Sequence, residues 1–361
     1  MTELGFVQGK ASPCIYYHAE RQLRVWVHGD DFVPLGYIGN VKWFFAELQK
    51  VWVVTDRGIL GPPGYHDCVQ RIRVLGRIVE WTADGITWEA DPRHAELIRK
   101  AYGVTGRSVT TPGVKDRADD IEGETQISKE AADRYRANTM RAQYLSTDRP
   151  EIQVQCRDLA RKMQQPSDLD EMGLKRLARF LGVQPRLVWV FKWQKRVTRI
   201  ETWCDTDHAG CIRTRKSVSG CALMLGVSTV CTYCKGQAVI ALSSGEAEYY
   251  GLVSAASQML GLQSILLDWG WKFNCHVWMD ATAGIAIGSR RGLGRVKHID
   301  TVFLWVQALV TEGRITIGKK ATKEMLADFL TKHVDAATMS TCLSGLAMKF
   351  QSGASKLTLK A

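Results

Sequence analysis

The chain has 361 residues, of which 45% are hydrophobic and 24% are charged, so it is long enough to bury two or more cores, which excludes a disordered polymer. Its net charge of +11 and its pI near 9.2 favour a polyanionic partner such as nucleic acid, although general solubility would also account for them. Ten scattered cysteines, with no secretory leader and no apolar run of membrane-spanning length, indicate a reducing compartment, cytoplasmic or nuclear, and no membrane partner.

The first predicted element is a hairpin over residues 23–33, in which one apolar strand turns through Asp30 and Asp31 into another. Residues 115–128 are polar and rich in Asp, Glu and Gly, so they predict a loop. Helices follow, because apolar residues recur there at helical spacing. These expected core residues are Ile152, Leu159, Met163, Leu174, Leu177 and Leu181. Residues 188–193 then predict a strand, the first of a new sheet.

Four acids lie further on in settings where a carboxylate is costly. Asp205 ends a strand-like run from Ile200, rich in β-branched and aromatic residues. Glu248 belongs to a helix that begins at Ser243, where Ser243 and Glu246 fit the capping pattern. Helical steps from Glu248 lead to apolar residues, so we expect its carboxylate to be buried and to need a partner.

The other two acids lie in comparable settings. Asp280 closes a strand-like run from His276 and precedes a helix over residues 281–287, and Asp328 lies in a segment that predicts an amphipathic helix. Taken singly, each of the four acids is more often a cap or a solvated side chain. Converging together, they would repel one another unless divalent cations such as magnesium neutralised them. Two such ions would then support phosphodiester cleavage.

Five blocks of sequence surround these acids in one order, and together they closely resemble the ribonuclease H domain of copia-type retrotransposon Pol polyproteins. They are DTDHAG at 205–210, RKSVSG at 215–220, LSSGEAEY at 242–249, KHID at 297–300 and ADFLTK at 327–332. The resemblance implies a mixed sheet flanked by helices that cuts the RNA strand of RNA:DNA hybrids with two Mg²⁺ ions, or Mn²⁺. It also implies that Asp205, Glu248, Asp280 and Asp328 are catalytic and bind the metal, with Asp207 as the alternative first ligand because residues two apart on a strand face the same way.

The resemblance extends upstream, to the reverse transcriptase part of such polyproteins, and reaches about Val334. The matching segments are residues 23–33, 75–79, 84–86, 110–112, 144–151 and 174–182. Asp30 and Asp31 correspond to the paired aspartates of the polymerase palm. The upstream palm aspartate has no counterpart before them, so we expect an incomplete polymerase site and no primer extension by this chain.

Several positions depart from the family pattern. His28 and Gly29 precede the paired aspartates where an aromatic residue is usual, and His208 replaces a tryptophan. Ala281 and Thr282 replace the amide pair that usually follows the third acid. These changes spare the metal ligands, but we expect weaker contacts with the hybrid.

A basic loop lies between the third and fourth acids, with four cations expected to contact nucleic acid: Arg290, Arg291, Arg295 and Lys297. His298 follows them. In ribonuclease H enzymes a loop histidine of this interval assists proton transfer or product departure, and the alternative is a structural histidine that fixes the loop through Asp300.

The sequence therefore predicts an α/β protein with four parts. These are a palm-like α+β fragment at 1–114, a helical connection at 115–185, a ribonuclease H-like domain at 186–340 and a frayed tail at 341–361. The predicted function is metal-dependent cleavage of RNA in RNA:DNA hybrids. The rivals are a catalytically idle nucleic-acid-binding relic and, on the spacing of Cys231 and Cys234 alone, a redox or zinc protein.

Overall fold

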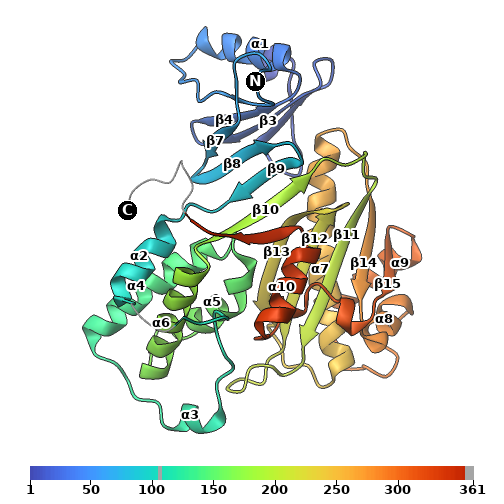
Figure 1. Ribbon diagram of the computed structural model, residues 1–361. Helices are drawn as coiled ribbons and strands as arrows, with labels where there is room; N and C mark the ends of the chain where they lie inside the picture. The colour runs from blue at the N-terminus through green and yellow to red at the C-terminus, as the bar shows by residue number, and fades with distance from the viewer. Residues whose placement is uncertain (105–107, 354–361) are drawn as a thin grey trace.

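The computed structural model describes residues 1–104 and 108–353. The amino-terminal part is a four-stranded antiparallel sheet packed against a helix, seen at the top of Figure 1. Its core consists of Phe6, Leu23, Val25, Phe44 and Leu48. The elements are η1 (Thr2–Leu4), β1 (Val7–Gln8), β2 (Ile15–His18), β3 (Leu23–His28), β4 (Asp31–Leu35) and α1 (Ile38–Gln49).

A second, five-stranded sheet in the order β16-β10-β9-β8-β7 joins distant parts of the chain. Its strands are β7 (Arg71–Val74), β8 (Arg77–Thr82), β9 (Gly85–Glu89), β10 (Arg186–Lys192) and β16 (Met348–Gln351), and a small parallel pair precedes it, β5 (Ile59–Leu60) and β6 (Cys68–Val69). The strand expected at 188–193 therefore exists, but its expected place in the same sheet as residues 200–205 was wrong. It pairs with β9 and β16 because Trp189 buries its ring there and donates its indole N–H to the Asp148 carbonyl oxygen at 2.7 Å.

Helices form over residues 115–185 as expected, at the lower left of Figure 1, and one further helix precedes them. Residues 118–122, which we expected to lie in a loop, form a short helix, because Asp119 and Asp120 lie in its first turn, where acids stabilise a helix. The elements are α2 (Arg93–Tyr102), α3 (Ala118–Glu122), α4 (Lys129–Leu145), η2 (Pro150–Ile152), α5 (Gln153–Ala160) and α6 (Asp168–Val183). The apolar residues predicted at helical spacing lie in the core of this helical part, except that Met163 is only partly buried. Helix α6 begins with a capping box between Ser167 and Asp170, which satisfies exposed backbone donors.

The third sheet is mixed and has the order β13-β12-β11-β14-β15. β11 runs antiparallel to β12, and β12 to β13, whereas β14 lies parallel to β11 and β15 parallel to β14. The strands are β11 (Arg199–Asp207), β12 (Val218–Leu225), β13 (Ser228–Gly236), β14 (Asn274–Met279) and β15 (Ile315–Lys319).

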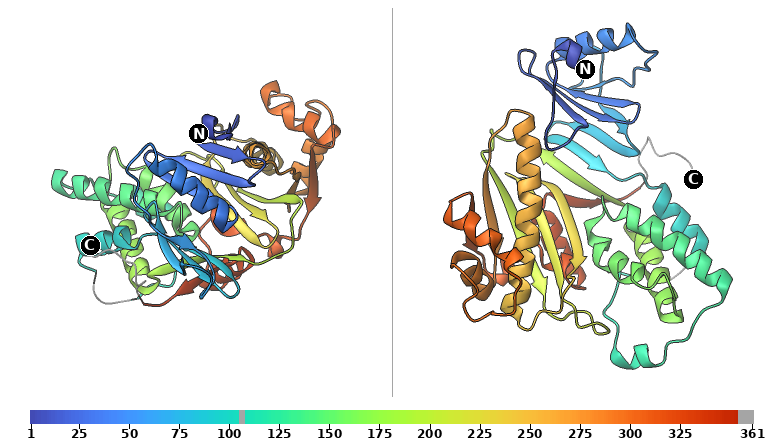
Figure 2. Two further views of the ribbon diagram at one scale, coloured as in Figure 1. Left: turned by 90° about the horizontal axis from the view of Figure 1, so that it is seen from above. Right: turned by 180° about the vertical axis from the view of Figure 1, so that it is seen from behind.

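Helices flank both faces of this sheet. Helix α7 lies on one face, which the right-hand view of Figure 2 shows in front, and α10 lies on the other, in front in Figure 1. The helical elements are α7 (Ser244–Asp268), α8 (Thr282–Ser289), η3 (Thr301–Leu304), α9 (Trp305–Thr311), η4 (Thr322–Glu324), η5 (Asp328–Leu330) and α10 (Ala336–Gly345). The predicted α/β class, with a mixed sheet between flanking helices, is confirmed.

Helix α7 corrects one expectation about membranes. Within residues 1–104 and 108–353 it is the one helix that is long and apolar enough to cross a membrane, whereas we expected no apolar run of that length. It contacts β11, β12 and β14, and 33% of its most apolar 18-residue stretch is buried. The core helix of a folded domain has the same length and composition, so α7 is weak evidence for a membrane span.

The carboxyl-terminal segment is also more ordered than expected. Residues 341–353 are not frayed, since α10 runs to Gly345 and β16 pairs with β10, placing Met348 opposite Trp189. Apolar side chains among the Ser, Gly and Lys residues explain this, because Leu343, Leu346 and Met348 are at most 3% exposed. Residues 354–361 lie outside the described part of the chain.

Candidate active site

Asp205 lies on β11 and is 6% exposed. The strand continues past it to Asp207, so Asp205 does not end the strand as expected. The Thr331 hydroxyl donates a hydrogen bond of 2.6 Å to Asp205 Oδ2 and also lies 2.9 Å from the Asp328 carbonyl oxygen. This bond fixes one carboxylate oxygen of Asp205 and leaves the other for a ligand.

Glu248 lies in the second turn of α7. Ser243 caps that helix as predicted, its hydroxyl accepting from the Glu246 N–H at 3.2 Å. The predicted reciprocal bond differs, because Glu246 Oε2 accepts from the Leu242 N–H rather than from Ser243. Glu248 is 6% exposed, and its Oε2 has no hydrogen-bond partner among the described residues. A buried acceptor without a partner is costly, and a cation bound at this oxygen would offset that cost.

Asp280 directly follows β14 and precedes α8, where the sequence placed it. It is half-buried, and its Oδ2 accepts a hydrogen bond from the Thr322 hydroxyl at 2.8 Å. Helix α8 approaches α7 closely at Gly284, where an added Cβ would lie 2.7 Å from the Glu248 Cβ. This glycine lets the two acids come together.

The three carboxylates converge, since one oxygen from each of Asp205, Glu248 and Asp280 lies within 4.8 Å of the others. Burial raises the pKa of Asp205 to about 6, and burial together with the charges of Asp205 and Asp280 raises the pKa of Glu248 to about 9. Oxygen-rich clusters of this kind suit hard divalent cations, whose charge would offset this cost. The residues present therefore fit a metal ion, held by these three carboxylates.

Asp328 stands beside this cluster rather than within it. We expected an amphipathic helix around Asp328, but this segment forms the short 3-10 turn η5. The chain turns twice within residues 322–330, at η4 and at η5, which prevents a longer helix. Its Oδ1 is paired with Lys332 Nζ at 2.6 Å. The charge of Asp328 still contributes to the raised pKa of Asp205, so the fourth acid is a neighbour whose carboxylate is neutralised by a lysine.

His298 contacts a different acid from the one expected. Its Nε2 lies 2.8 Å from Glu246 Oε2, whereas Asp300 caps η3 by accepting from the Val302 N–H at 3.0 Å. Glu246 is 1% exposed, so His298 shields the acid that also holds the Leu242 N–H at the start of α7. The local sequence carried no sign of this contact because the two residues are 52 positions apart.

The four cations of the basic loop differ in their exposure to solvent. Arg291, Arg295 and Lys297 are exposed, as a nucleic-acid contact requires. Arg290 is instead half-buried and donates to the Leu293 carbonyl oxygen of its own loop. We therefore expect three of the four predicted cations to be available to phosphates.

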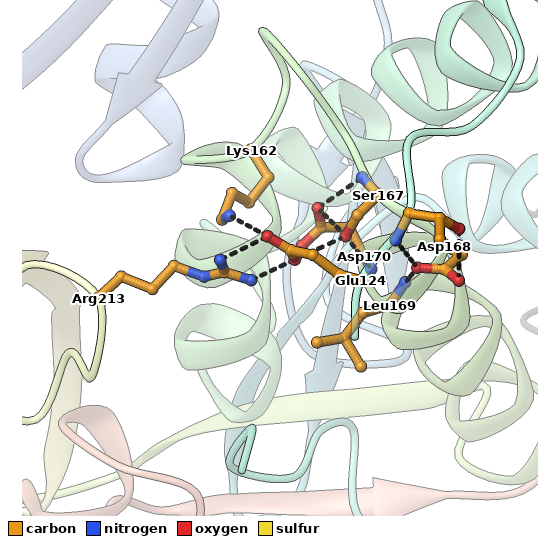
Figure 3. Close-up of polar contacts among 8 residues, drawn as sticks. Glu124, Lys162, Ser167, Asp168, Leu169, Asp170 and Arg213 are labelled. Atoms are coloured by element: carbon orange, nitrogen blue, oxygen red, sulfur yellow. Dashed lines mark hydrogen bonds and ion pairs between the residues drawn. The ribbon is translucent and has the colours of Figure 1, made fainter. Parts of the chain in front are cut away.

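The loop after β11 is tied to the helical connection, as Figure 3 shows. Arg213 makes a bidentate ion pair with Glu124, whose Oε2 also accepts from the Ser167 hydroxyl at 3.0 Å, and Lys162 lies 3.9 Å from the same carboxylate. The Arg213 guanidinium holds the pKa of the Glu124 carboxyl below its usual range. Sequence reasoning missed this network, which anchors the loop after β11 to a residue 89 positions away in the chain.

The structure adds little support for the other two predicted sites, the paired aspartates and the cysteine pair. Asp30 and Asp31 lie at the turn between β3 and β4, as expected of the hairpin, but both are exposed. Cys231 and Cys234 lie three positions apart on β13, so their side chains face opposite sides of the strand. Among the described residues, Asp205, Glu248 and Asp280 form the single group of three or more ligating side chains close enough for a metal ion.

Comparison with known proteins confirms the resemblance to transposon Pol polyproteins, although no family model matches the chain. It is 25% identical over 240 residues to the retrovirus-related Pol polyprotein from transposon RE1 of Arabidopsis thaliana, which covers 66% of this chain and 16% of the polyprotein. It is 22% identical over 358 residues to that from transposon TNT 1-94 of Nicotiana tabacum, covering 93% of this chain and 25% of the polyprotein. The chain thus spans a quarter or less of the length of these two relatives.

Two solved structures have low overall similarity to this chain. One is an N-terminal ribonuclease H domain from Mycobacterium tuberculosis, with a TM-score of 0.28 and 17% identity, covering 42% of this chain and 99% of that chain. The other is a foamy viral protease-reverse transcriptase in complex with an RNA/DNA hybrid, with a TM-score of 0.46 and 9% identity, covering 82% of this chain and 36% of that chain.

Proposed function

We propose that this chain is a Pol-derived ribonuclease H that cleaves the RNA strand of RNA:DNA hybrids and requires Mg²⁺, with Mn²⁺ as a substitute. The observation that carries the proposal is the convergence of Asp205, Glu248 and Asp280 from β11, α7 and the end of β14, with a buried carboxylate oxygen left unpaired. The similarity to transposon Pol polyproteins and the five sequence blocks around these acids support the same chemistry.

The carboxylates of Asp205, Glu248 and Asp280 would hold the metal, and Asp328 is proposed as the fourth ligand, which requires its carboxylate to exchange Lys332 for the metal. Bound there, two Mg²⁺ ions would supply an activated water and stabilise the leaving oxygen of the phosphodiester. Thr331 and Thr322 orient the first and third acids through their hydroxyls. Fixing these side chains in advance lowers the cost of ordering the site when substrate binds.

The hybrid would be held by charge. Arg291, Arg295 and Lys297 project from the loop between α8 and η3, which follows the Asp280 segment in the chain, and the net charge of +11 favours any polyanion. Such phosphate contacts carry little sequence information, which suits an enzyme that acts on hybrids of any sequence.

The proposal is tested by incubating purified protein with a labelled RNA:DNA hybrid, a matched DNA duplex and a matched RNA duplex. We expect cleavage of the RNA strand of the hybrid alone, with Mg²⁺ or Mn²⁺, and none after chelation. Ca²⁺ should bind without supporting comparable turnover, because it is larger and less strict in geometry. Equal cleavage of all three duplexes, or cleavage that survives chelation, would contradict the proposal.

A nucleic-acid-binding relic without turnover is the second candidate, favoured by two specific observations. Lys332 forms an ion pair with the Asp328 carboxylate. Ala281 and Thr282 also stand where the resembled family has an amide pair. This candidate predicts hybrid binding that falls steeply with salt and does not depend on divalent ions. The cleavage assay separates the two.

The role of His298 can be tested apart from the acids. Because its contact is with buried Glu246, we expect His298→Ala to lower the free energy of unfolding by about 1 kcal/mol and to weaken hybrid binding. His298→Gln keeps a donor for Glu246 and should restore much of the loss. The measurements are urea unfolding and steady-state kinetics. Lower kcat with unchanged KM and unchanged unfolding would instead assign His298 to the chemical step.

The polymerase part and the compartment remain proposals. Asp30 and Asp31 are proposed as the remnant of a polymerase site. A reducing intracellular compartment, cytoplasmic or nuclear, is proposed because all ten cysteines are free thiols in the structure.

A further inference from the structure

Two tryptophans meet on the surface where the second sheet approaches the catalytic sheet. Trp81 lies on β8 and Trp193 directly follows β10, and their ring centroids are 4.5 Å apart at an interplanar angle of 48°. Trp193 is 49% exposed, although burying its ring would be favourable. Half of a large aromatic surface is therefore free for a partner.

The segment that carries Trp193 is held rigidly from two sides. The Trp193 N–H donates to the Asp84 carbonyl oxygen at 2.9 Å, which ties it to the hairpin between β8 and β9. The neighbouring Gln194 amide donates to the Leu225 carbonyl oxygen at 2.9 Å and accepts from the Val227 N–H at 3.0 Å, which ties it to the hairpin between β12 and β13. A backbone that is fixed at the ring limits the entropy lost on binding.

Cations flank Trp193 in the chain. Lys192, Lys195 and Arg196 are all exposed, and none forms an ion pair with the residues that the structure describes. One exposed acid, Asp84, lies at the tip of the neighbouring hairpin. Within residues 192–196 the balance is three positive charges and no negative charge. We call Trp81, Lys192, Trp193, Lys195 and Arg196 the Trp193 platform.

We propose that the Trp193 platform binds a single-stranded nucleic acid that continues from the hybrid held at the acidic site. An unpaired base would stack on Trp193, and the phosphates on either side would contact Lys192, Lys195 and Arg196. An aromatic ring among cations is the arrangement by which proteins bind single strands without sequence preference. A fully paired duplex hides the faces of its bases, so an exposed ring favours a strand with unpaired bases.

The position of the platform agrees with this partner. It precedes Arg199, the first residue of β11, and Asp205 lies further along the same strand. The platform lies near that end of β11, because Gln194 contacts Leu225, which pairs with Ile200. At about 3.3 Å per residue, Arg199 and Asp205 are about 20 Å apart. A strand with a rise of about 3.4 Å per nucleotide spans that distance with about six nucleotides. The hybrid would thus occupy the acidic site while its single-stranded end reaches the platform.

A second copy of this chain is the alternative partner for an exposed tryptophan, and charge disfavours it. Pairing two identical platforms would bring together two clusters of three cations on chains that each carry a net charge of +11. The same charges favour a polyanion. Self-association is therefore an outcome of the test rather than the proposal.

The inference rests on the proposed function, and the test uses substrates that separate the two. One is a blunt hybrid too short to reach from the acidic site to the platform, and the other is the same hybrid with a single-stranded overhang. Affinities are measured by fluorescence anisotropy in Ca²⁺, and cleavage in Mg²⁺. The variants are Trp193→Ala, Trp193→Phe and, as the matched control, Trp52→Ala, because Trp52 is 52% exposed elsewhere on the surface.

We expect Trp193→Ala to weaken binding of the overhang substrate by about 5- to 100-fold, the loss typical of one stacked base. Trp193→Phe should retain most of the affinity, and Trp52→Ala all of it. Changing Lys195 or Arg196 to Gln should each reduce the slope of log affinity against log salt by about 1. Affinity for the short blunt hybrid, and its cleavage, should be unchanged by all of these variants.

The inference is overturned if Trp193→Ala binds the overhang substrate as wild type does, or if Trp52→Ala loses as much affinity. It is also overturned if Trp193→Ala changes the sedimentation of the protein and not its affinity, since the platform would then be a self-association surface. If wild type cleaves the blunt hybrid but Trp193→Ala binds the overhang substrate as wild type does, the proposed function still holds and the platform does not. A Trp193 effect on binding without any cleavage supports the platform and removes the proposed activity.

Discussion

Asp280→Asn should lower the rate of hybrid cleavage by about a hundredfold or more, with little change in fold. The amide keeps the size of the carboxylate and still offers an oxygen to the Thr322 hydroxyl, which donates to Asp280 Oδ2 at 2.8 Å. The negative charge is lost, and with it a ligand for the divalent ion. Metal ions contribute several kcal/mol to such reactions, and about 3 kcal/mol corresponds to a hundredfold.

The matched control is Asp300→Asn, an acid in the same part of the chain outside the cluster. Its oxygen accepts from the Val302 N–H, and asparagine caps a helix equally well, so this variant should cleave as wild type does. Cleavage is measured as initial rates over a range of Mg²⁺ concentrations. Equal rates for Asp280→Asn and wild type would assign the activity to a contaminant, and equal losses in both variants would indicate a general effect of charge.

The strands and the helix start that carry the three clustered acids were predictable because their signals are local. A stretch rich in β-branched and aromatic residues predicted β11, and Ser243 predicted the start of α7 through its hydroxyl. A run of apolar residues ending at Asp280 predicted β14 in the same way. The meeting of the acids was not a local signal. It followed from the charge argument and from the resemblance to known polyproteins.

Features that depend on contacts between distant residues were missed. The strand at β10 was predicted, but its partners are β9 and β16, which lie about a hundred residues before it and over a hundred after it in the chain. The segment around Asp328 has the composition of an amphipathic helix, yet Thr331 and Lys332 hold it as a 3-10 turn against Asp205. Propensity favours a helix there, and tertiary contacts override it.

Glu248→Gln should stabilise the metal-free protein at alkaline pH while abolishing cleavage. Burial and the charges of Asp205 and Asp280 raise the pKa of Glu248 to about 9, from an ordinary value of 4.5. A raised pKa in the folded state means that the folded protein binds the extra proton, so its contribution to stability is complete below pH 4.5 and declines as the pH rises towards 9. Glutamine resembles the protonated acid at every pH, so it escapes this decline.

The stability difference should therefore grow with pH. In the presence of a chelator we expect the two proteins to be close at pH 5, and Glu248→Gln to be more stable by about 1–3 kcal/mol at pH 8, since each pKa unit corresponds to about 1.4 kcal/mol and relaxation of the site reduces the total. The measurement is urea unfolding at both pH values, with the exposed Glu312→Gln as a control that should show no such trend.

Adding Mg²⁺ should reverse the order of stability. An ion that binds the folded protein at a hundred times its dissociation constant stabilises it by about 2.7 kcal/mol, and only the wild type keeps all three carboxylates. A difference between the variants that is the same at pH 5 and pH 8 would show that Glu248 carries no raised pKa. A Glu248→Gln protein that gains as much stability from Mg²⁺ as wild type would place the ion elsewhere, and the three acids would then share a site without a metal.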